Sequence, residues 1–310
     1  MIRNLAIAVI AIAVCALGVL FLLGRSYQAA AITGFVYSPD GTTALSTGSD
    51  GTVELLDAET GKELKHFTGF GSPTIQAVYS KTGSQAIVGA SDGSIVTIDI
   101  ASGKESSRLQ TPAGLDKMAL APDDRSVAAL DTHNKVRIYR DDGALLSEFS
   151  GSGIVSGITW CPGSDCILLW GKDGLLEVWN PFVPAFLANL RGHRRDIRAA
   201  VFSRDGERLC TTDVERSVLV WNSSTGNRMF TLPSLTEDPL ALAWSRDRRR
   251  IAVETISGKA YVWDVDGGQP VIIGPEHGTG QGWITFTPGG QRIMLGGWSK
   301  GPTATEIPEE

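Results

Sequence analysis

Histidine and cysteine, which most often bind metals or act as nucleophiles, are scarce in this chain. Its 310 residues include four of each, and no zinc-protease, haem-attachment, phosphate-loop or nucleophile-elbow motif occurs. The run Gly153–Gly157 resembles a nucleophile elbow, but its serine falls in a predicted strand. The run Asp264–Gly267 resembles the start of a calcium loop, but the later oxygen ligands are lacking and a β-turn accounts for it. We therefore predict no catalytic residue, no cofactor and no metal, and expect that the chain is not an enzyme.

Two of the cysteines lie close together in the sequence. Cys161 and Cys166 flank a four-residue turn at the mouth of a predicted β-hairpin. Facing residues of a hairpin lie about 4.5–5.5 Å apart, which is within the range of a disulfide. The pattern is compatible with a disulfide in an oxidising compartment, and two free thiols in a cytosolic sheet are the alternative.

The N-terminal segment has the composition of a membrane span. Residues 5–24 carry no charge, and as a helix they would cover about 30 Å, the thickness of a bilayer core. We expect residues 1–31 to form one transmembrane anchor, from Leu5 to Gly24, and a short linker. A cleaved signal sequence, with Ala29 to Ala31 as the cleavage site, is the alternative.

Charges around this span bear on its orientation. Arg3 and the α-amino group precede it, and Arg25 follows it. Because positive charge is enriched on the cytoplasmic side, this asymmetry favours an exported, periplasmic or extracellular body. A body on the cytoplasmic side remains the alternative.

The rest of the chain is acidic. The net charge is -6, and residues 1–30 contain two arginines and no carboxylate, so the remainder has 26 basic and 34 acidic residues, a balance of -8. Negative charge repels phosphate backbones, and we therefore exclude nucleic acid as a partner.

A repeat of about 42 residues runs through the acidic part of the chain. Each copy has an apolar segment, a turn such as Ser-Pro-Asp-Gly, a second apolar segment, another turn, and an alternating segment that ends at an aromatic position. The second-turn positions recur at intervals of 42, 41, 40, 42 and 42 residues. They are Asp50, Asp92, His133, Asp173, Glu215 and Ser257, and the aromatic positions six residues later are Leu56, Ile98, Tyr139, Trp179, Trp221 and Trp263.

This repeat predicts the fold. Four short antiparallel strands cannot bury both faces of their sheet alone, but copies that pack face to face around an axis can. Continuing the period predicts a seventh, incomplete copy, with a strand over 291–297 and Thr305 at the aromatic position. We therefore predict an all-β, seven-bladed propeller over 32–310, preceded by the N-terminal transmembrane helix.

The repeats resemble those of the WD-repeat propeller family. The fifth copy opens with Gly192-His193 and has Trp221-Asn222 in place of Trp-Asp, whereas the sixth has Trp263-Asp264. The resemblance implies a buried structural tetrad of His193, Thr211, Glu215 and Trp221, with glutamate replacing the family's aspartate. It also implies that a strand ahead of residue 32 completes the last blade. Either residues 25–31 supply this strand, or the blade keeps an open edge that a partner strand could join.

Two surface features are candidates for partner binding. Arginine side chains suit carboxylate or phosphate groups, and exposed aromatic side chains can anchor a partner. The candidates are an arginine cluster of Arg191, Arg194, Arg195 and Arg198, and two aromatic residues, Phe182 and Phe186. Solvated arginines and an inward-packed Phe186 are the respective alternatives.

These features favour a binding function. We expect a membrane-anchored scaffold that mediates protein–protein interaction, as an accessory or assembly subunit of a membrane protein complex. The alternative is an exported propeller enzyme or small-ligand binder that uses the central channel, because propellers host many functions.

Overall fold

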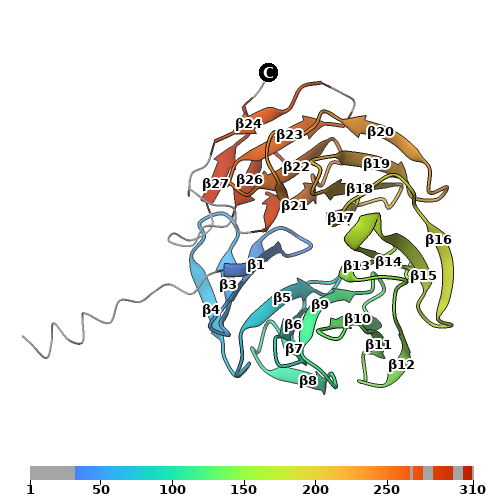
Figure 1. Cartoon of the computed structure of the whole chain (residues 1–310). Helices are drawn as coiled ribbons and strands as arrows, with labels where there is room; N and C mark the ends of the chain where they lie inside the picture. The colour runs from blue at the N-terminus through green and yellow to red at the C-terminus, as the bar shows by residue number, and fades with distance from the viewer. Residues whose placement is uncertain (1–31, 266–267, 275–281, 296–302, 309–310) are drawn as a thin grey trace, which may run out of the picture. The chain divides into compact units, whose positions relative to one another are not determined.

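The computed structural model describes residues 32–265, 268–274, 282–295 and 303–308, which form seven antiparallel sheets arranged as the blades of a propeller (Figure 1). Each of the first six sheets has four strands in sequence order, and three strands of the seventh are described. One turn of 3-10 helix, η1 (Lys172–Gly174), interrupts the fourth blade. The predicted all-β, seven-bladed propeller is therefore confirmed.

The strands of the first four blades follow one another without crossovers. Blade one contains β1 (Ile32–Tyr37), β2 (Thr43–Gly48), β3 (Val53–Asp57) and β4 (Glu63–Phe67). Blade two contains β5 (Thr74–Tyr79), β6 (Gln85–Ala90), β7 (Ser94–Asp99) and β8 (Glu105–Gln110). Blade three contains β9 (Leu115–Leu120), β10 (Ser126–Asp131), β11 (Val136–Arg140) and β12 (Leu145–Phe149). Blade four contains β13 (Val155–Trp160), β14 (Ile167–Gly171), β15 (Leu176–Asn180) and β16 (Ala185–Asn189).

The remaining blades repeat this order. Blade five contains β17 (Ile197–Phe202), β18 (Arg208–Asp213), β19 (Val218–Asn222) and β20 (Arg228–Leu232). Blade six contains β21 (Pro239–Trp244), β22 (Arg250–Thr255), β23 (Ala260–Asp264) and β24 (Val271–Ile273). The described strands of blade seven are β25 (Ile284–Phe286), β26 (Arg292–Leu295) and β27 (Thr303–Glu306). The first strands surround the axis and the fourth strands lie at the periphery (Figure 1).

The aromatic position of the repeat falls in the third strand of each blade. Trp179, Trp221 and Trp263 lie in β15, β19 and β23, and Thr305 lies in β27. The period found in the sequence is therefore the blade spacing, and the seventh copy is a blade.

Turn chemistry explains why the first two strands of each blade form a hairpin. In blade one the Ser38 hydroxyl donates to the Asp40 carboxylate at 2.6 Å, and Gly41 adopts a φ of +80°. Glycine tolerates this left-handed conformation because it has no Cβ. The same position holds Asp124 in blade three and Ser164 in blade four, each at a φ of +61°. Short polar side chains tolerate the conformation better than apolar ones.

The hydrophobic core is divided among the junctions between consecutive blades. Six buried clusters join blades one and two, two and three, three and four, four and five, five and six, and six and seven. Blades seven and one meet through Phe35 and Trp283, whose rings stack at 5.4 Å. Each sheet thus buries both faces against its neighbours, as the repeat predicts.

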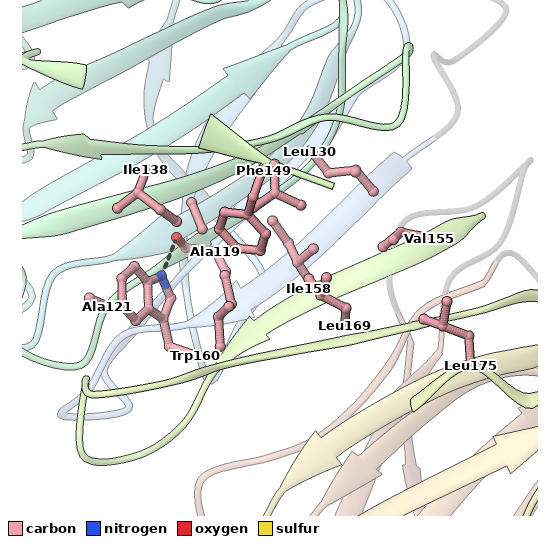
Figure 2. Packing of buried hydrophobic residues seen from close by; sticks show 13 residues of the cluster. Ala119, Ala121, Leu130, Ile138, Phe149, Val155, Ile158, Trp160, Leu169 and Leu175 are labelled. Carbon is pink, nitrogen blue, oxygen red and sulfur yellow. Dashed lines mark hydrogen bonds between the residues drawn. The ribbon is translucent and has the colours of Figure 1, made fainter. Parts of the chain in front are cut away.

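The junction of blades three and four illustrates this packing (Figure 2). Ile138 and Phe149 of blade three lie against Ile158 and Leu169 of blade four. The indole of Trp160 donates across the junction to the carbonyl oxygen of Ala119 at 3.0 Å. This bond satisfies the buried N–H of the large indole ring, so the ring can be buried without loss of a hydrogen bond.

The expected membrane span and closing strand lie outside the described residues. These expectations concern Leu5 to Gly24 and residues 25–31, whereas the first described strand begins at Ile32. Within the described parts of the chain, no helix is long and apolar enough to cross a membrane. The predicted boundary between residues 31 and 32 and the transmembrane helix therefore stay predictions.

Replacing Gly171 with alanine tests the close packing inside blade four. A Cβ at the end of β14 would clash with the backbone carbonyl of Ile154, which cannot move without breaking the pairing of β13 and β14. We expect Gly171→Ala to cost about 1–3 kcal/mol or more and to lower the Tm of the chain by several degrees. Gly289→Ala is the control, because a Cβ at that position would have no heavy atom within 4 Å among the described residues, apart from its chain neighbours. Equal Tm values for the two variants would contradict the packing described for blade four.

Candidate functional site

Blade five contains a buried hydrogen-bond chain that links four side chains. His193 Nδ1 lies 2.5 Å from Asp213 Oδ2, and His193 Nε2 lies 2.7 Å from Thr211 Oγ1. The Trp221 indole donates to the same threonine oxygen at 2.8 Å. The His193 and Asp213 side chains are 1% and 2% exposed. Because the set is enclosed by the sheet, it is suited to hold the blade together rather than to contact a substrate.

The acidic member of this set differs from the sequence prediction. Glu215 was expected, but its carboxylate is 51% exposed and accepts a bond from Arg195 at 3.2 Å. Asp213, the last residue of β18, occupies the position instead. The expectation of Glu215 was therefore wrong, because the carboxylate that faces His193 lies eight residues before Trp221 rather than six.

The position of Asp213 recurs in blade three. Asp213 Oδ1 accepts from the backbone N–H groups of Glu215 and Ser217, both at 3.0 Å. Asp131, the last residue of β10, accepts in the same way from the residues two and four positions later. Its second oxygen bonds Arg137 rather than a histidine. Blades three and five thus have the same type of turn, but the second carboxylate oxygen has a different partner in each blade.

Cys161 and Cys166 form a disulfide across the turn between β13 and β14. Their Cα atoms are 5.2 Å apart, and the Cys161 N–H donates to the Cys166 carbonyl at 2.9 Å. The third cysteine of the described residues, Cys210, is a buried free thiol whose pKa is raised by burial. A buried thiol of raised pKa is unreactive, so Cys210 has the properties of a core residue.

Of the two candidate aromatic residues, Phe182 lies in the turn before β16 and Phe186 is the second residue of that strand. Phe182 is 45% and Phe186 is 51% exposed. Each also contacts a tryptophan of the same blade, Phe182 with Trp160 at 5.9 Å and Phe186 with Trp179 at 5.7 Å between ring centroids. The tryptophans therefore hold both rings in place while about half of each residue stays exposed to solvent.

Further exposed apolar residues lie near these phenylalanines, and the repeat pattern of the sequence does not indicate them. Val183 and Leu187 are exposed beside the phenylalanines, and Leu145 and Leu146 are exposed on β12 of the adjacent blade. A hydrogen bond from the Ser147 hydroxyl to the Pro181 carbonyl joins β12 to the loop that precedes β16, whereas Leu145 pairs with Tyr139 and lies on the other face of blade three. We call the four exposed side chains of blade four the β16 surface: Phe182, Val183, Phe186 and Leu187.

The arginine cluster lies apart from the β16 surface. Arg191, Arg194, Arg195 and Arg198 are all exposed, in the connection from β16 to β17 and at the start of β17. The loop of Phe182 precedes β16, whereas this connection follows it. A five-residue strand is about 17 Å long, so the phenylalanine loop and the arginine cluster lie at opposite ends of β16. The structure does not bring the two groups into one site.

The motifs considered for catalysis lie in ordinary structural elements. Ser156 is the second residue of β13, where no strand-to-helix turn presents it, and Asp264 ends β23. Residues 266 and 267 of the second motif are outside the described chain. Among the described residues, no group of three or more histidine, cysteine or carboxylate side chains could hold a metal ion.

Asp213→Asn and Glu215→Gln distinguish the two carboxylates. The first weakens charged hydrogen bonds in a buried site, and we expect a cost of about 1.5–3 kcal/mol. The second changes an exposed pair and should cost less than about 1 kcal/mol. Thermal unfolding of the two variants measures both values, and a larger effect of Glu215→Gln would restore glutamate to the tetrad.

Acidification adds a second readout for Asp213. Burial raises its pKa, but the hydrogen bonds from His193 and the backbone outweigh burial and leave the pKa below its ordinary value. The stabilisation is complete above the pKa of the unfolded chain and is lost as the pH falls through the folded one. The difference in Tm between the wild type and Asp213→Asn should therefore shrink below about pH 4.

Comparisons with known proteins agree with the repeat architecture. The family model described as "WD domain, G-beta repeat" matches residues 23–57 and 185–222. The second match includes His193, Thr211, Asp213 and Trp221, and the first begins ahead of β1. The chain is also similar to the "Probable cytosolic iron-sulfur protein assembly protein 1" of Vanderwaltozyma polyspora, with 25% identity over 107 residues. This similarity covers 28% of the chain and 31% of the relative's length. The chain thus carries WD40 repeats on a seven-bladed β-propeller.

Proposed function

We propose that this chain is a scaffold that binds other proteins through the outside of its propeller, as a subunit of a larger assembly. The observation that carries the proposal is the β16 surface, where four large apolar side chains remain exposed. Contiguous apolar patches on a folded domain mark interaction sites. Aromatic anchors held in a fixed orientation, as Phe182 and Phe186 are by their tryptophans, lose little conformational freedom on binding.

The outer strand itself supports the same proposal. Among the outer strands of the described blades, β16 is the one in which every residue is exposed. Its sequence AFLAN carries no charge, whereas β4 and β8 each carry both signs of charge. Charges on an edge strand prevent pairing with other chains. An uncharged edge flanked by apolar side chains is suited to be covered by a partner.

The arginine cluster offers a second, polar contact. None of the ion pairs found among the described residues includes Arg191, Arg194 or Arg198, and the body of the protein has a charge of -8. A local excess of positive charge on an acidic body steers an acidic partner toward one end of blade four. Such a contact sets orientation and association rate more than affinity.

We further propose that the scaffold is tethered to a membrane by Leu5 to Gly24 and serves a membrane protein complex. The uncharged N-terminal stretch and its flanking arginines support the tether. The bond between Cys161 and Cys166 supports an exported body, because disulfides persist in oxidising compartments. The assembly role in the name of the Vanderwaltozyma polyspora relative supports the subunit part of the proposal, at the level of a shared repeat.

Val183→Ser with Leu187→Ser tests the β16 surface. Neither side chain makes a ring contact or is buried, so the propeller should keep its Tm within a few degrees while proteins that co-purify with the full chain in mild detergent are lost. Leu64→Ser with Met229→Ser is the matched control, because these residues are similarly exposed on other outer strands. The co-purifying proteins, quantified by mass spectrometry, should remain with the control. Their retention by the β16 variant, or a lone monomer from wild-type cells, would overturn the proposed use of this surface.

Thiol labelling in the native host tests the compartment of the body. Cells lysed in a maleimide reagent should leave the peptides of Cys161 and Cys166 unlabelled until a reductant is added, because both thiols are in the disulfide. Cys210 should label only after denaturation, since it is fully buried. Labelling of Cys161 and Cys166 before reduction would indicate a reducing compartment and contradict an exported body.

A further inference from the structure

The propeller has a cavity of about 520 Å³ at the end of its first strands, where they turn into the second strands. Its walls are mostly apolar and come from blades one, two, five, six and seven. The larger side chains are Tyr37, Tyr79, Phe202, Trp244 and Phe286, each the last residue of a first strand. The volume is within the range of about 300–1,000 Å³ that is typical of ligand sites.

Positively charged residues border this cavity. The second position of the first turn is proline in four blades and a basic residue in the other three. Two of these basic residues, Arg204 and Arg246, line the cavity together with Pro39 and Pro288. The Arg246 guanidinium donates to the backbone carbonyl of Pro39 in blade one, which holds it beside the opening.

The carboxylates of the neighbouring turns already accept hydrogen bonds from nearby groups of the protein. Asp205 accepts from the Ser203 hydroxyl at 2.6 Å and from Arg248 at 2.5 Å. Asp247 accepts from the Ser245 hydroxyl at 2.6 Å and from the backbone N–H of Arg249 at 3.0 Å. Asp40 is bound in the same way by Ser38 and Thr42. These carboxylates satisfy their own turns, and none of the ion pairs of the described residues involves Arg204 or Arg246.

The lining therefore has positive charge without negative charge. It includes no aspartate, glutamate or histidine. The two tyrosines are neutral near pH 7, because the ordinary pKa of tyrosine is about 10. Burial raises the pKa of Tyr37 further and raises that of Tyr79 to about 12. Carboxylates on a ligand would meet two guanidinium groups beside an aromatic wall, which is a favourable place for a charge-assisted hydrogen bond.

We propose that this cavity binds an acidic peptide segment of a partner protein, with an apolar or aromatic side chain inside and a neighbouring carboxylate on Arg204 and Arg246. This inference rests on the proposed scaffold function and adds a second partner site, apart from the β16 surface. An extended peptide fits the combination because its successive side chains can supply one apolar group and one carboxylate.

An array of hexapeptides provides the test. Each peptide contains glutamate beside phenylalanine or leucine, and a matched array has glutamine for every glutamate. The full chain in detergent should bind members of the glutamate array, and the glutamine array at least about tenfold more weakly, because charge-assisted bonds are stronger than neutral ones. Arg204→Ala with Arg246→Ala should reduce binding to the glutamate array by a similar factor. Arg228→Ala with Arg249→Ala is the control of equal charge change, because both residues are exposed and do not line the cavity.

Three results would overturn the inference: no binding to either array, equal binding to both arrays, or equal losses in the two double variants. A Tm close to that of the wild type establishes that the cavity variant is folded. If it is not, Arg204→Lys with Arg246→Lys, which keeps the charge, should retain part of the preference for glutamate. Co-purification separates the two proposals. If the β16 variant loses the partner proteins and the cavity variant keeps them, the cavity site is refuted and the scaffold function is not.

Discussion

The mutual burial of neighbouring sheets is the constraint on which this structure depends. A single four-stranded sheet has two apolar faces, and each face is removed from water only by the next blade. The clusters at the six junctions and the stacking of Phe35 on Trp283 carry this burial around the ring. Consequently the amino-acid sequence of the inner three strands of a blade has little freedom to vary. Differences that could distinguish partners are confined to the turns and the outer strands, which is where the β16 surface and the arginines are found.

The amino-acid sequence predicts the fold well because this constraint repeats. Trp179, Trp221 and Trp263 mark the third strands at intervals of 42 residues, and extrapolation by one period locates Thr305 in β27. The period says less about which side chains meet. Glu215 occupies the expected position but points to solvent, whereas Asp213 faces His193. The signal that identifies Asp213 is Asp131, which lies 82 residues earlier, two blades away, and forms the same turn.

The interaction surfaces are harder to predict for a geometric reason. Ser147 and Pro181 are 34 residues apart in the sequence and form a hydrogen bond because consecutive blades are adjacent. The outer strand of each blade also has few contacts beyond its own sheet. The alternation of apolar and polar residues, which indicates the buried face of an inner strand, therefore does not indicate which residues of an outer strand are buried. The residues that line the cavity are even farther apart in the sequence, because its walls come from five blades. Arg204 and Arg246 look like ordinary turn residues until the ring brings their positions together.

The tetrad of blade five shows how the fold accommodates buried polar groups without a fixed sequence. The aspartate at the end of the second strand needs a partner for its second oxygen, since a buried carboxylate without one is costly. Blade five supplies His193, and blade three supplies Arg137, which also binds Glu148 at 2.7 Å. Blade four takes a different route, in which Glu177 accepts from the Trp179 indole at 2.9 Å. In all three blades the buried polar groups have hydrogen-bond partners, although the partner residues differ. Blades that lack the family's histidine can therefore keep the same geometry with other residues.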